Sequence, residues 1–162
     1  MPPPAALHIR PAVRQDCPLI LHFIWALAEY EKLSHRVIAT ESRLTKTLFG
    51  GRPGAEVLIA EWLGEAAGFA LYFPNYSTFL AQPGIYLEDL FVIPEFRSKG
   101  FGRQMLVTLA RLARERNSGR LEWSVLDWNQ PAIDFYLKIG ARPQSEWTVF
   151  RMDEMAIQKL AE

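Results

Sequence analysis

The chain has 162 residues, with 18 Lys and Arg against 18 Asp and Glu, so its formal net charge is zero. Its length predicts a single domain, residues 1–162, that can bury about 70% of its unfolded surface without a disulfide or a metal. This balance argues against non-specific nucleic-acid binding, which needs an excess of basic residues or a basic face.

The rest of the composition indicates a cytoplasmic protein. Cys17 is the only cysteine, so no intrachain disulfide can form; a buried helix position is favoured for it over a reactive thiol. The three histidines lack metal-ligand spacing, which argues against a metal site. The longest apolar stretch, residues 17–28, is too short to span a membrane, and the N-terminus lacks a signal-peptide pattern. We therefore expect neither a nucleic-acid nor a membrane partner.

Caps, breakers and hydrophobic periodicity predict the elements in chain order. Residues 1–5, with Pro2 to Pro4, are expected to be a disordered end. The first half contains a strand from Ala6 to Ala12, a helix capped by Asp16 that runs through Glu31, a helix from Thr40 to Leu48, and strands from Val57 to Trp62 and Ala67 to Phe73. The second half contains a loop from Pro74 to Gly84, strands from Ile85 to Ile93, Arg120 to Leu126 and Trp147 to Met152, and helices from Gly100 to about Arg116 and Asn129 to Ile139.

This order combines an antiparallel meander with a βαβ crossover. It predicts a mixed α/β (α+β) class with one central, mostly antiparallel sheet of six to seven strands and helices on both faces.

The first motif that indicates chemistry is Arg97-x-x-Gly100-x-Gly102, where a strand leads into a helix. Glycines let the backbone approach a ligand, and the new helix adds exposed N–H groups and a partial positive charge. Together with Lys99 and Arg103, the motif predicts a cradle for a diphosphate. The alternative is a plain strand-to-helix turn with solvated basic residues.

Two better-known phosphate loops do not fit this segment. A P-loop needs Gly-Lys followed by Ser or Thr, whereas Gly102 precedes Arg103 and Gln104. A dinucleotide fingerprint needs a third glycine where this chain has Met105.

The second motif is Asn129-x-x-Ala132-x-x-x-Tyr136. Asn129 is a good helix N-cap with Pro131 in the first turn, and Tyr136 lies two turns further along the same face. Tyr136 is either a half-buried aromatic residue that packs with Phe135 or a phenol that donates a proton to a developing anion.

Together, in this order, the two motifs resemble the acetyl-CoA-binding core of GNAT-superfamily N-acetyltransferases. The resemblance covers nearly the whole chain and is closest to the spermidine/spermine (diamine) N-acetyltransferase family. Its landmarks are Leu27-Ala-x-Tyr-Glu31, Tyr86-Leu-Glu-Asp-Leu-Phe-Val92 and Glu146-Trp147.

The resemblance implies a GNAT-like fold and a role for each site residue. A bulged strand would offer free N–H groups to the pantetheine arm and the thioester carbonyl, and residues 98–103 would hold the diphosphate. Glu88 would remove the amine proton, directly or through water, and Tyr136 would protonate the departing thiolate. The residues implied for acetyl-CoA are Leu90, Phe91, Val92, Arg97, Ser98, Lys99, Gly100, Phe101, Gly102, Arg103, Asn129, Ala132 and Tyr136.

The chemistry explains why such groups are needed. A primary amine with a pKa near 10.4 is only about 0.04% neutral at pH 7, a penalty of roughly 4–5 kcal/mol that a placed base reduces. The oxyanion formed at the carbonyl needs fixed donors. We expect direct acetyl transfer in a ternary complex without an acyl-enzyme.

The expected acceptor site consists of carboxylates and aromatic rings suited to a cation. The candidates are Tyr30, Glu31, Glu88, Asp89, Glu146 and Trp147. By resemblance, Glu146 and Trp147 would reach across the interface of a homodimer. Solvated surface charge is the alternative for Asp89 and Glu146.

Two segments indicate which amine is accepted. The segment from Asn75 to Gly84 has no acid, whereas spermidine/spermine enzymes carry an aspartate and a tryptophan there, and Val125 to Gln130 resembles the thialysine-acetylating branch. We therefore predict acetyl transfer to a small primary amine, such as a diamine, a polyamine or a lysine analogue like thialysine, and favour the last. The alternatives are an acetyl-CoA-binding regulatory module without catalysis and a protein or peptide amine acetyltransferase.

Overall fold

The computed structural model describes residues 7–162, so the expectation for residues 1–5 lies outside the described residues. The described residues divide into two compact units, residues 7–124 and residues 125–162. A single domain over the whole chain stays a prediction.

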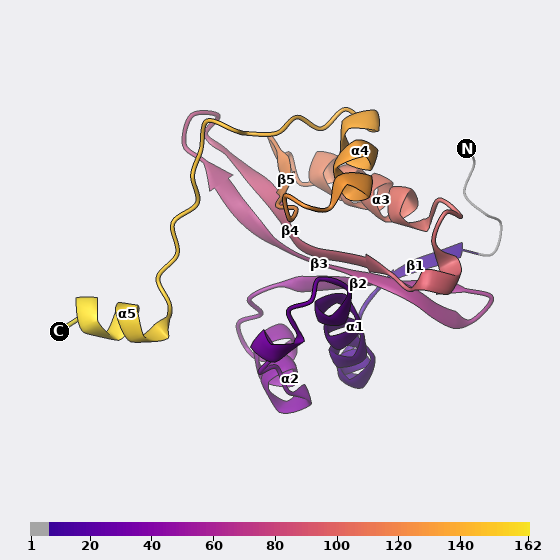
Figure 1. The fold of residues 1–162 in the computed structure, drawn as a ribbon, viewed down its shortest axis with the longest axis horizontal. Coiled ribbons are helices and arrows are strands. Elements are labelled where there is room, and N and C mark those ends of the chain that lie inside the picture. Colours follow the sequence, from indigo (N-terminus) through magenta and orange to yellow (C-terminus); the bar gives the residue numbers. More distant parts are fainter. Residues whose placement is uncertain (1–6) are drawn as a thin grey trace. The chain divides into compact units, whose positions relative to one another are not determined.

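The first unit is built on one mixed sheet (Figure 1). Its strands are β1 (Leu7–Pro11), β2 (Glu56–Trp62), β3 (Glu65–Ser77), β4 (Gln82–Val92) and β5 (Leu121–Trp123), in the spatial order β1-β2-β3-β4-β5. Neighbours among the first four are antiparallel, and β5 runs parallel to β4 after a crossover through helix α3 (Phe101–Glu115). The mixed α/β class is confirmed, but the described residues form five strands rather than six to seven.

The expected loop from Pro74 to Gly84 is instead the end of a long hairpin. β3 and β4 stay paired as far as Ser77 and Gln82, and only a short turn joins them. Phe73 and Tyr86 stack across the pair with ring centroids 5.3 Å apart. Cross-strand aromatic packing of this kind extends a hairpin past the proline that argues for a loop.

Two helices, α1 (Cys17–Tyr30) and α2 (Glu41–Phe49), cover one face of the sheet (Figure 1). Thr40 caps α2 as predicted, because its hydroxyl accepts a hydrogen bond from the N–H of Arg43 at 3.2 Å. Cys17 is 1% exposed, so the buried position predicted for it is confirmed. Its Sγ accepts a hydrogen bond from the hydroxyl of Thr45 at 3.4 Å.

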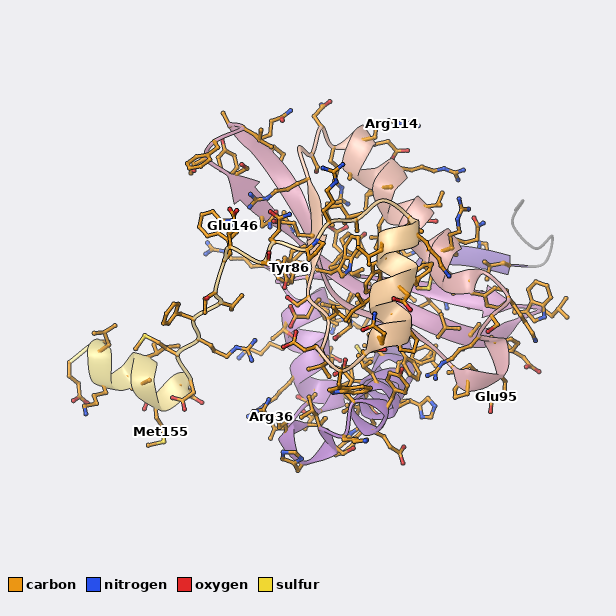
Figure 2. All side chains as sticks on the ribbon, turned by 45° about the horizontal axis from the view of Figure 1, so that its top comes forward. Arg36, Tyr86, Glu95, Arg114, Glu146 and Met155 are labelled. Atoms are coloured by element: carbon orange, nitrogen blue, oxygen red, sulfur yellow. The ribbon has the colours of Figure 1, made fainter. Side chains whose placement is uncertain are left out.

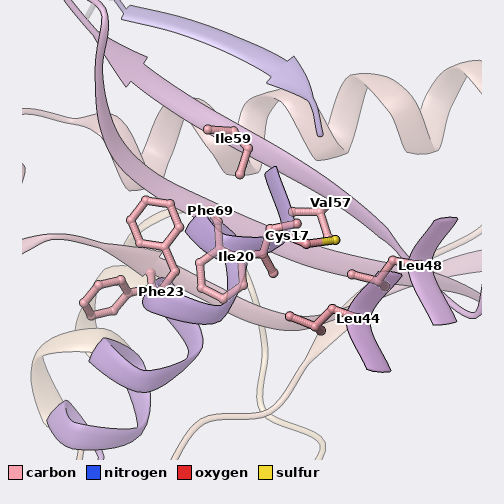
Figure 3. Packing of buried hydrophobic residues seen from close by; sticks show 9 residues of the cluster. Cys17, Ile20, Phe23, Leu44, Leu48, Val57, Ile59 and Phe69 are labelled. Atoms are coloured by element: carbon pink, nitrogen blue, oxygen red, sulfur yellow. The ribbon is translucent and has the colours of Figure 1, made fainter. Parts of the chain in front are cut away.

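The core beneath these helices is aliphatic and aromatic (Figure 3). Phe23 stacks on Phe69 with ring centroids 5.4 Å apart. The cluster comprises Cys17, Ile20, Phe23, Leu44, Leu48, Val57, Ile59, Phe69 and Phe91.

Helix α3 covers the opposite face (Figure 1). Its predicted stripe is buried at Phe101, Met105, Leu109 and Ala113, and Leu112 is half-buried. The Phe101 ring lies 5.2 Å from that of Trp62 on β2. Among residues 7–162, no helix is both long and apolar enough to cross a bilayer.

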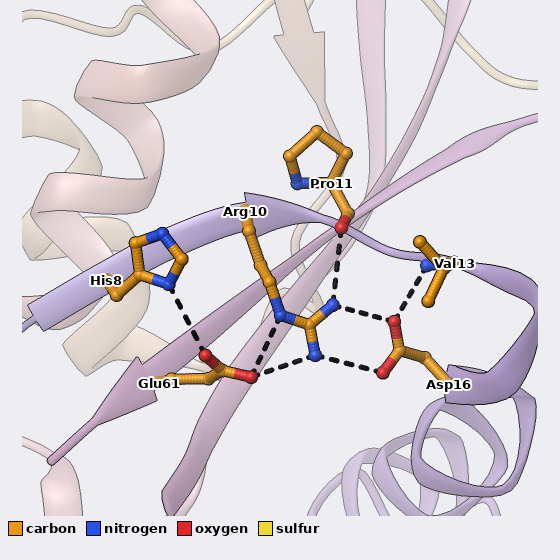
Figure 4. A network of polar contacts seen from close by, with 6 residues as sticks. All are labelled: His8, Arg10, Pro11, Val13, Asp16 and Glu61. Atoms are coloured by element: carbon orange, nitrogen blue, oxygen red, sulfur yellow. Dashed lines mark hydrogen bonds and ion pairs between the residues drawn. The ribbon is translucent and has the colours of Figure 1, made fainter. Parts of the chain in front are cut away.

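A network around Arg10 joins β1, β2 and the start of α1 (Figure 4). The Arg10 guanidinium donates to the Asp16 carboxylate at 2.7 and 3.0 Å and to Glu61 at 2.9 Å. Asp16 stands at the N-cap of α1 as expected, but its side chain makes no cap bond. Its carboxylate accepts instead from Arg10 and from the N–H of Val13, at 2.7 Å. The Asp16 carboxylate thus binds the Arg10 guanidinium rather than the N–H groups of the first turn of α1.

The second unit contains helices α4 (Gln130–Lys138) and α5 (Glu154–Leu160). The prediction of a strand from Trp147 to Met152 is wrong, because those residues have no regular secondary structure. A strand needs a partner edge, and no described strand pairs with this segment. Sequence reasoning also missed α5, which Asp153 caps by accepting from the N–H of Ala156 at 2.8 Å.

Candidate active site

The outer edge of β4 is open along its second half. β5 pairs with β4 only from Ile85 to Leu87, and no described strand pairs beyond that point. The N–H of Ile93 donates to the carbonyl of Ala67 at 3.0 Å, and in an antiparallel ladder hydrogen-bonded residues alternate with residues whose N–H and C=O point away. Leu90 and Val92 therefore direct their backbone groups to the open edge.

A β-bulge lies where this open edge begins. Asp89 pairs with Leu71, but Leu87 pairs with Tyr72, so Glu88 is the extra residue on β4. A regular strand would turn Glu88 and Asp89 to opposite faces, whereas a bulge re-aims the side chain it inserts. Glu88 and Asp89 accordingly line the same hollow.

This hollow, of about 420 Å³, lies between α1, the segment that follows it and β4, and we call it the acidic hollow. It brings together Glu31, Glu88 and Asp89, three of the residues predicted to bind the acceptor. Sequence reasoning missed residues 33–39, because no periodicity or motif marks them as part of a site. The hollow is lined by Ile24, Leu27, Ala28, Glu31, Leu33, Arg36, Val37, Ile38, Ala39, Glu88 and Asp89.

The electrostatics of the hollow favour a cation. Burial, and then the neighbouring charges of Glu88 and Glu31, together raise the pKa of Asp89 to about 7. Burial also raises the pKa of Glu31. Carboxylates that destabilise one another's charge in a partly dry site gain from a positively charged ligand.

The loop after β4 presents backbone donors. Ser98 and Gly100 are left-handed, with φ of 61° and 81°, the second of which only glycine adopts readily. Gly100 stands at the N-cap of α3 without a side-chain cap bond. The first-turn N–H groups of α3 therefore have no side-chain partner and carry the positive end of the helix dipole, as an anion site requires.

Arg97 ties this loop to β4. Its Nε donates to the carbonyl of Val92 at 2.8 Å, which agrees with the outward direction of that group. Its guanidinium carbon lies 4.7 Å from the ring centroid of Tyr30 and 5.4 Å from that of Phe91. Arg97 itself thus covers one face of Tyr30, and a role for Tyr30 with the acceptor stays a prediction.

The other predicted residues lie in the second unit. Asn129 caps α4, since its side-chain oxygen accepts from the N–H of Ala132 at 3.4 Å. Tyr136 lies against Phe135 at 5.5 Å between ring centroids, so this packing is present whatever else the phenol does. Glu146 lies in a turn (Figure 2), and Trp147 is 74% exposed.

Comparison with known proteins gives a consistent result. Residues 20–141 match the family model described as the acetyltransferase (GNAT) family. The chain is 39% identical over 168 residues to the thialysine N-epsilon-acetyltransferase of Sus scrofa, covering 97% of this chain and 98% of that one. It is 34% identical over 197 residues to the L-ornithine N5-acetyltransferase NATA1 of Arabidopsis thaliana, covering 94% and 86%. An integron cassette protein from the mobile metagenome of V. cholerae has a TM-score of 0.81, with 28% identity over 98% of this chain and 99% of that one.

Proposed function

The chain belongs to the GNAT acetyltransferase family, and from this premise we propose that it moves an acetyl group from acetyl-CoA directly to the primary amine of a lysine-like or ornithine-like small molecule. GNAT acetyltransferases use acetyl-CoA as their co-substrate. The observation that carries the proposal is the position of Glu88, which both begins the open edge of β4 and lines the acidic hollow. An amine held there would lie beside the backbone edge suited to the acetyl donor.

We assign the acetyl-CoA contacts from the first unit outward. The N–H groups of Leu90 and Val92 would bond the pantetheine arm and polarise the thioester carbonyl. The N–H groups of residues 100–103 would bind the diphosphate, helped by the charges of Lys99 and Arg103. The amide NH₂ of Asn129 is proposed to donate to the pantetheine, since its oxygen already serves α4.

The proposed chemistry needs one base and one acid. The acceptor enters the acidic hollow as an ammonium ion, where the carboxylates attract it. Glu88 takes one of its protons, directly or through water, and the neutral amine attacks the thioester carbonyl. As the tetrahedral intermediate collapses, the C–S bond breaks and Tyr136 donates its phenolic proton to the departing CoA thiolate. The nitrogen loses its second proton as the amide forms, and a proton returns to the Tyr136 phenolate through solvent.

Two finer features belong to this proposal. We propose a homodimer, supported by the apolar side chains that residues 147–160 expose, among them Trp147 at 74%, Phe150 at 92% and Leu160 at 75%. We also propose the cytoplasm as the location, where acetyl-CoA is available and where a protein whose one cysteine is a buried thiol needs no oxidising environment.

The test is CoA release from acetyl-CoA with thialysine, lysine, ornithine, putrescine, spermidine and a lysine-containing peptide. We expect the amino acids to be preferred, and Glu88→Gln and Tyr136→Phe each to lower kcat by roughly 10²- to 10⁴-fold. Glu65→Gln and Tyr76→Phe make the same chemical changes at exposed positions and should leave kcat unaltered.

Three outcomes would overturn parts of the proposal. Acetyl-CoA binding without turnover of any amine would identify a binding module. Preference for the peptide would identify a protein acetyltransferase. Full activity of Tyr136→Phe would remove that residue from the role of the acid.

A further inference from the structure

The acidic hollow also contains a cation, and this cation suggests how the acceptor is selected. We propose that Arg36 binds a carboxylate of the acceptor, so that the site prefers amines that also carry a carboxylate to diamines and polyamines. This inference rests on the proposed function and names the acceptor class of the same site.

Arg36 is placed there by the chain reversal after α1. It is the last residue of the short 3₁₀ turn η2 (Ser34–Arg36) and is labelled in Figure 2. Its backbone N–H donates to the carbonyl of Leu33 at 2.9 Å. Its side chain lines the hollow together with Glu31, Glu88 and Asp89. The site therefore offers three potential anions and one cation within about 420 Å³.

The Arg36 guanidinium is not paired with any of the three carboxyl groups that line the hollow. Within residues 7–162, the Arg36 guanidinium makes no hydrogen bond or ion pair, although three carboxyl groups line the same hollow. The pKa of Asp89 reflects this separation, because Glu88 and Glu31 raise it and no nearby guanidinium lowers it. Arg36 and the carboxylates thus act as separate charged groups in one hollow.

The surface between the charged groups is apolar. Ile24, Leu27, Val37 and Ile38 contribute hydrocarbon to the lining. A ligand that matches this lining has an ammonium group for the acids, a methylene or thioether chain for the hydrocarbon, and a carboxylate for Arg36. Basic amino acids and their sulfur analogues have this chemistry.

The same arrangement disfavours polyamines. A second ammonium group brought toward Arg36 would meet a like charge, which is a means of excluding a competing ligand. A guanidinium is well suited to a carboxylate because its donors form a planar fork that matches the two oxygens. Since the carboxylate is remote from the reacting amine, losing this contact should raise KM and leave kcat nearly unchanged.

The experiment compares matched acceptors that differ only in the carboxylate, namely lysine with cadaverine and ornithine with putrescine. Steady-state kinetics are measured for wild type, Arg36→Gln, Arg36→Lys and the control Arg52→Gln, which removes the same charge from an exposed loop position. Thermal unfolding of each variant shows whether the fold is kept.

We expect Arg36→Gln to lower the ratio of kcat/KM for lysine over cadaverine by roughly 10- to 100-fold, through the KM of lysine. Arg36→Lys should recover part of the ratio, and Arg52→Gln should keep the wild-type ratio. A ratio unchanged in Arg36→Gln, or an equal loss for both acceptors, would overturn this inference while leaving the proposed function in place. A wild-type protein that acetylates neither member of either pair would overturn the proposed function itself.

Discussion

Asp89 is the residue whose charge state depends most on the fold. Its pKa is about 7, against an ordinary value of 3.8, because burial and two neighbouring carboxylates oppose ionisation. The folded state therefore binds the proton more tightly than the unfolded chain, and the stability contributed by this group decreases as the pH rises from about 4 to about 7.

Replacing Asp89 by asparagine removes this dependence. We expect Asp89→Asn to raise the free energy of unfolding by about 4 kcal/mol at pH 9 and to have little effect below about pH 3, where both states of the wild type are protonated. Denaturant unfolding across this pH range measures the difference. Asp127→Asn serves as the control, and equal stability of wild type and Asp89→Asn at pH 9 would contradict the prediction.

The stability contributed by Asp16 changes with pH in the opposite direction. The hydrogen-bonded Arg10 guanidinium holds the pKa of this carboxyl below its ordinary value, so the stabilisation is present above about pH 4 and is lost as the pH falls through the lowered pKa. We expect Asp16→Asn to cost about 1 kcal/mol at pH 7, a modest value because the pair is partly solvated. The cost should shrink toward pH 2, and a pH-independent difference would show that the charge is not responsible.

At the scale of elements, Gly68 lets β3 and β4 lie close together, and this contact fixes the position of β4 and of its open edge. A Cβ on Gly68 would collide with the carbonyl oxygen of Phe91 and would lie 3.1 Å from the Cα of Val92. We expect Gly68→Ala to displace β4, to destabilise the protein by about 1–3 kcal/mol and to weaken acetyl-CoA binding several-fold. Gly51→Ala is the control, because a Cβ there meets nothing within 4 Å. Unfolding and calorimetric titration measure both effects, and wild-type values for Gly68→Ala would show that this contact is dispensable.

At the scale of the whole molecule, the C-terminal segment is the surface on which the proposed homodimer depends. Trp147, Val149 and Phe150 expose large apolar side chains close together in sequence, and apolar side chains gathered on a surface are typical of an interaction site. In the proposed homodimer, a second copy would cover these side chains. We expect wild type to sediment with the mass of two chains and Phe150→Glu to shift toward the mass of one. Leu63→Glu, at an exposed hairpin position, should stay a dimer. A monomeric wild type at micromolar concentration would rule out the dimer.

The sequence predicted most elements because their signals are local. The stripe of α3, the Thr40 and Asn129 caps and the glycine at the start of α3 follow from spacing and backbone preference within a few residues. The same local reasoning was wrong at Asp16 and at the Pro74–Gly84 segment, where Arg10 and the Phe73–Tyr86 stack, each brought close by pairing, decide the outcome.

The sequence by itself therefore determined the class of fold, the family and the types of group available for chemistry. Only the tertiary structure decided that Glu88 occupies a bulge, that Glu88 and Asp89 line one hollow, and that Arg36 lies in that hollow without an ion partner among the described residues. The physical reason is that strand register, burial and charge proximity depend on which distant segments come together, whereas caps, turns and periodicity depend only on neighbours along the chain.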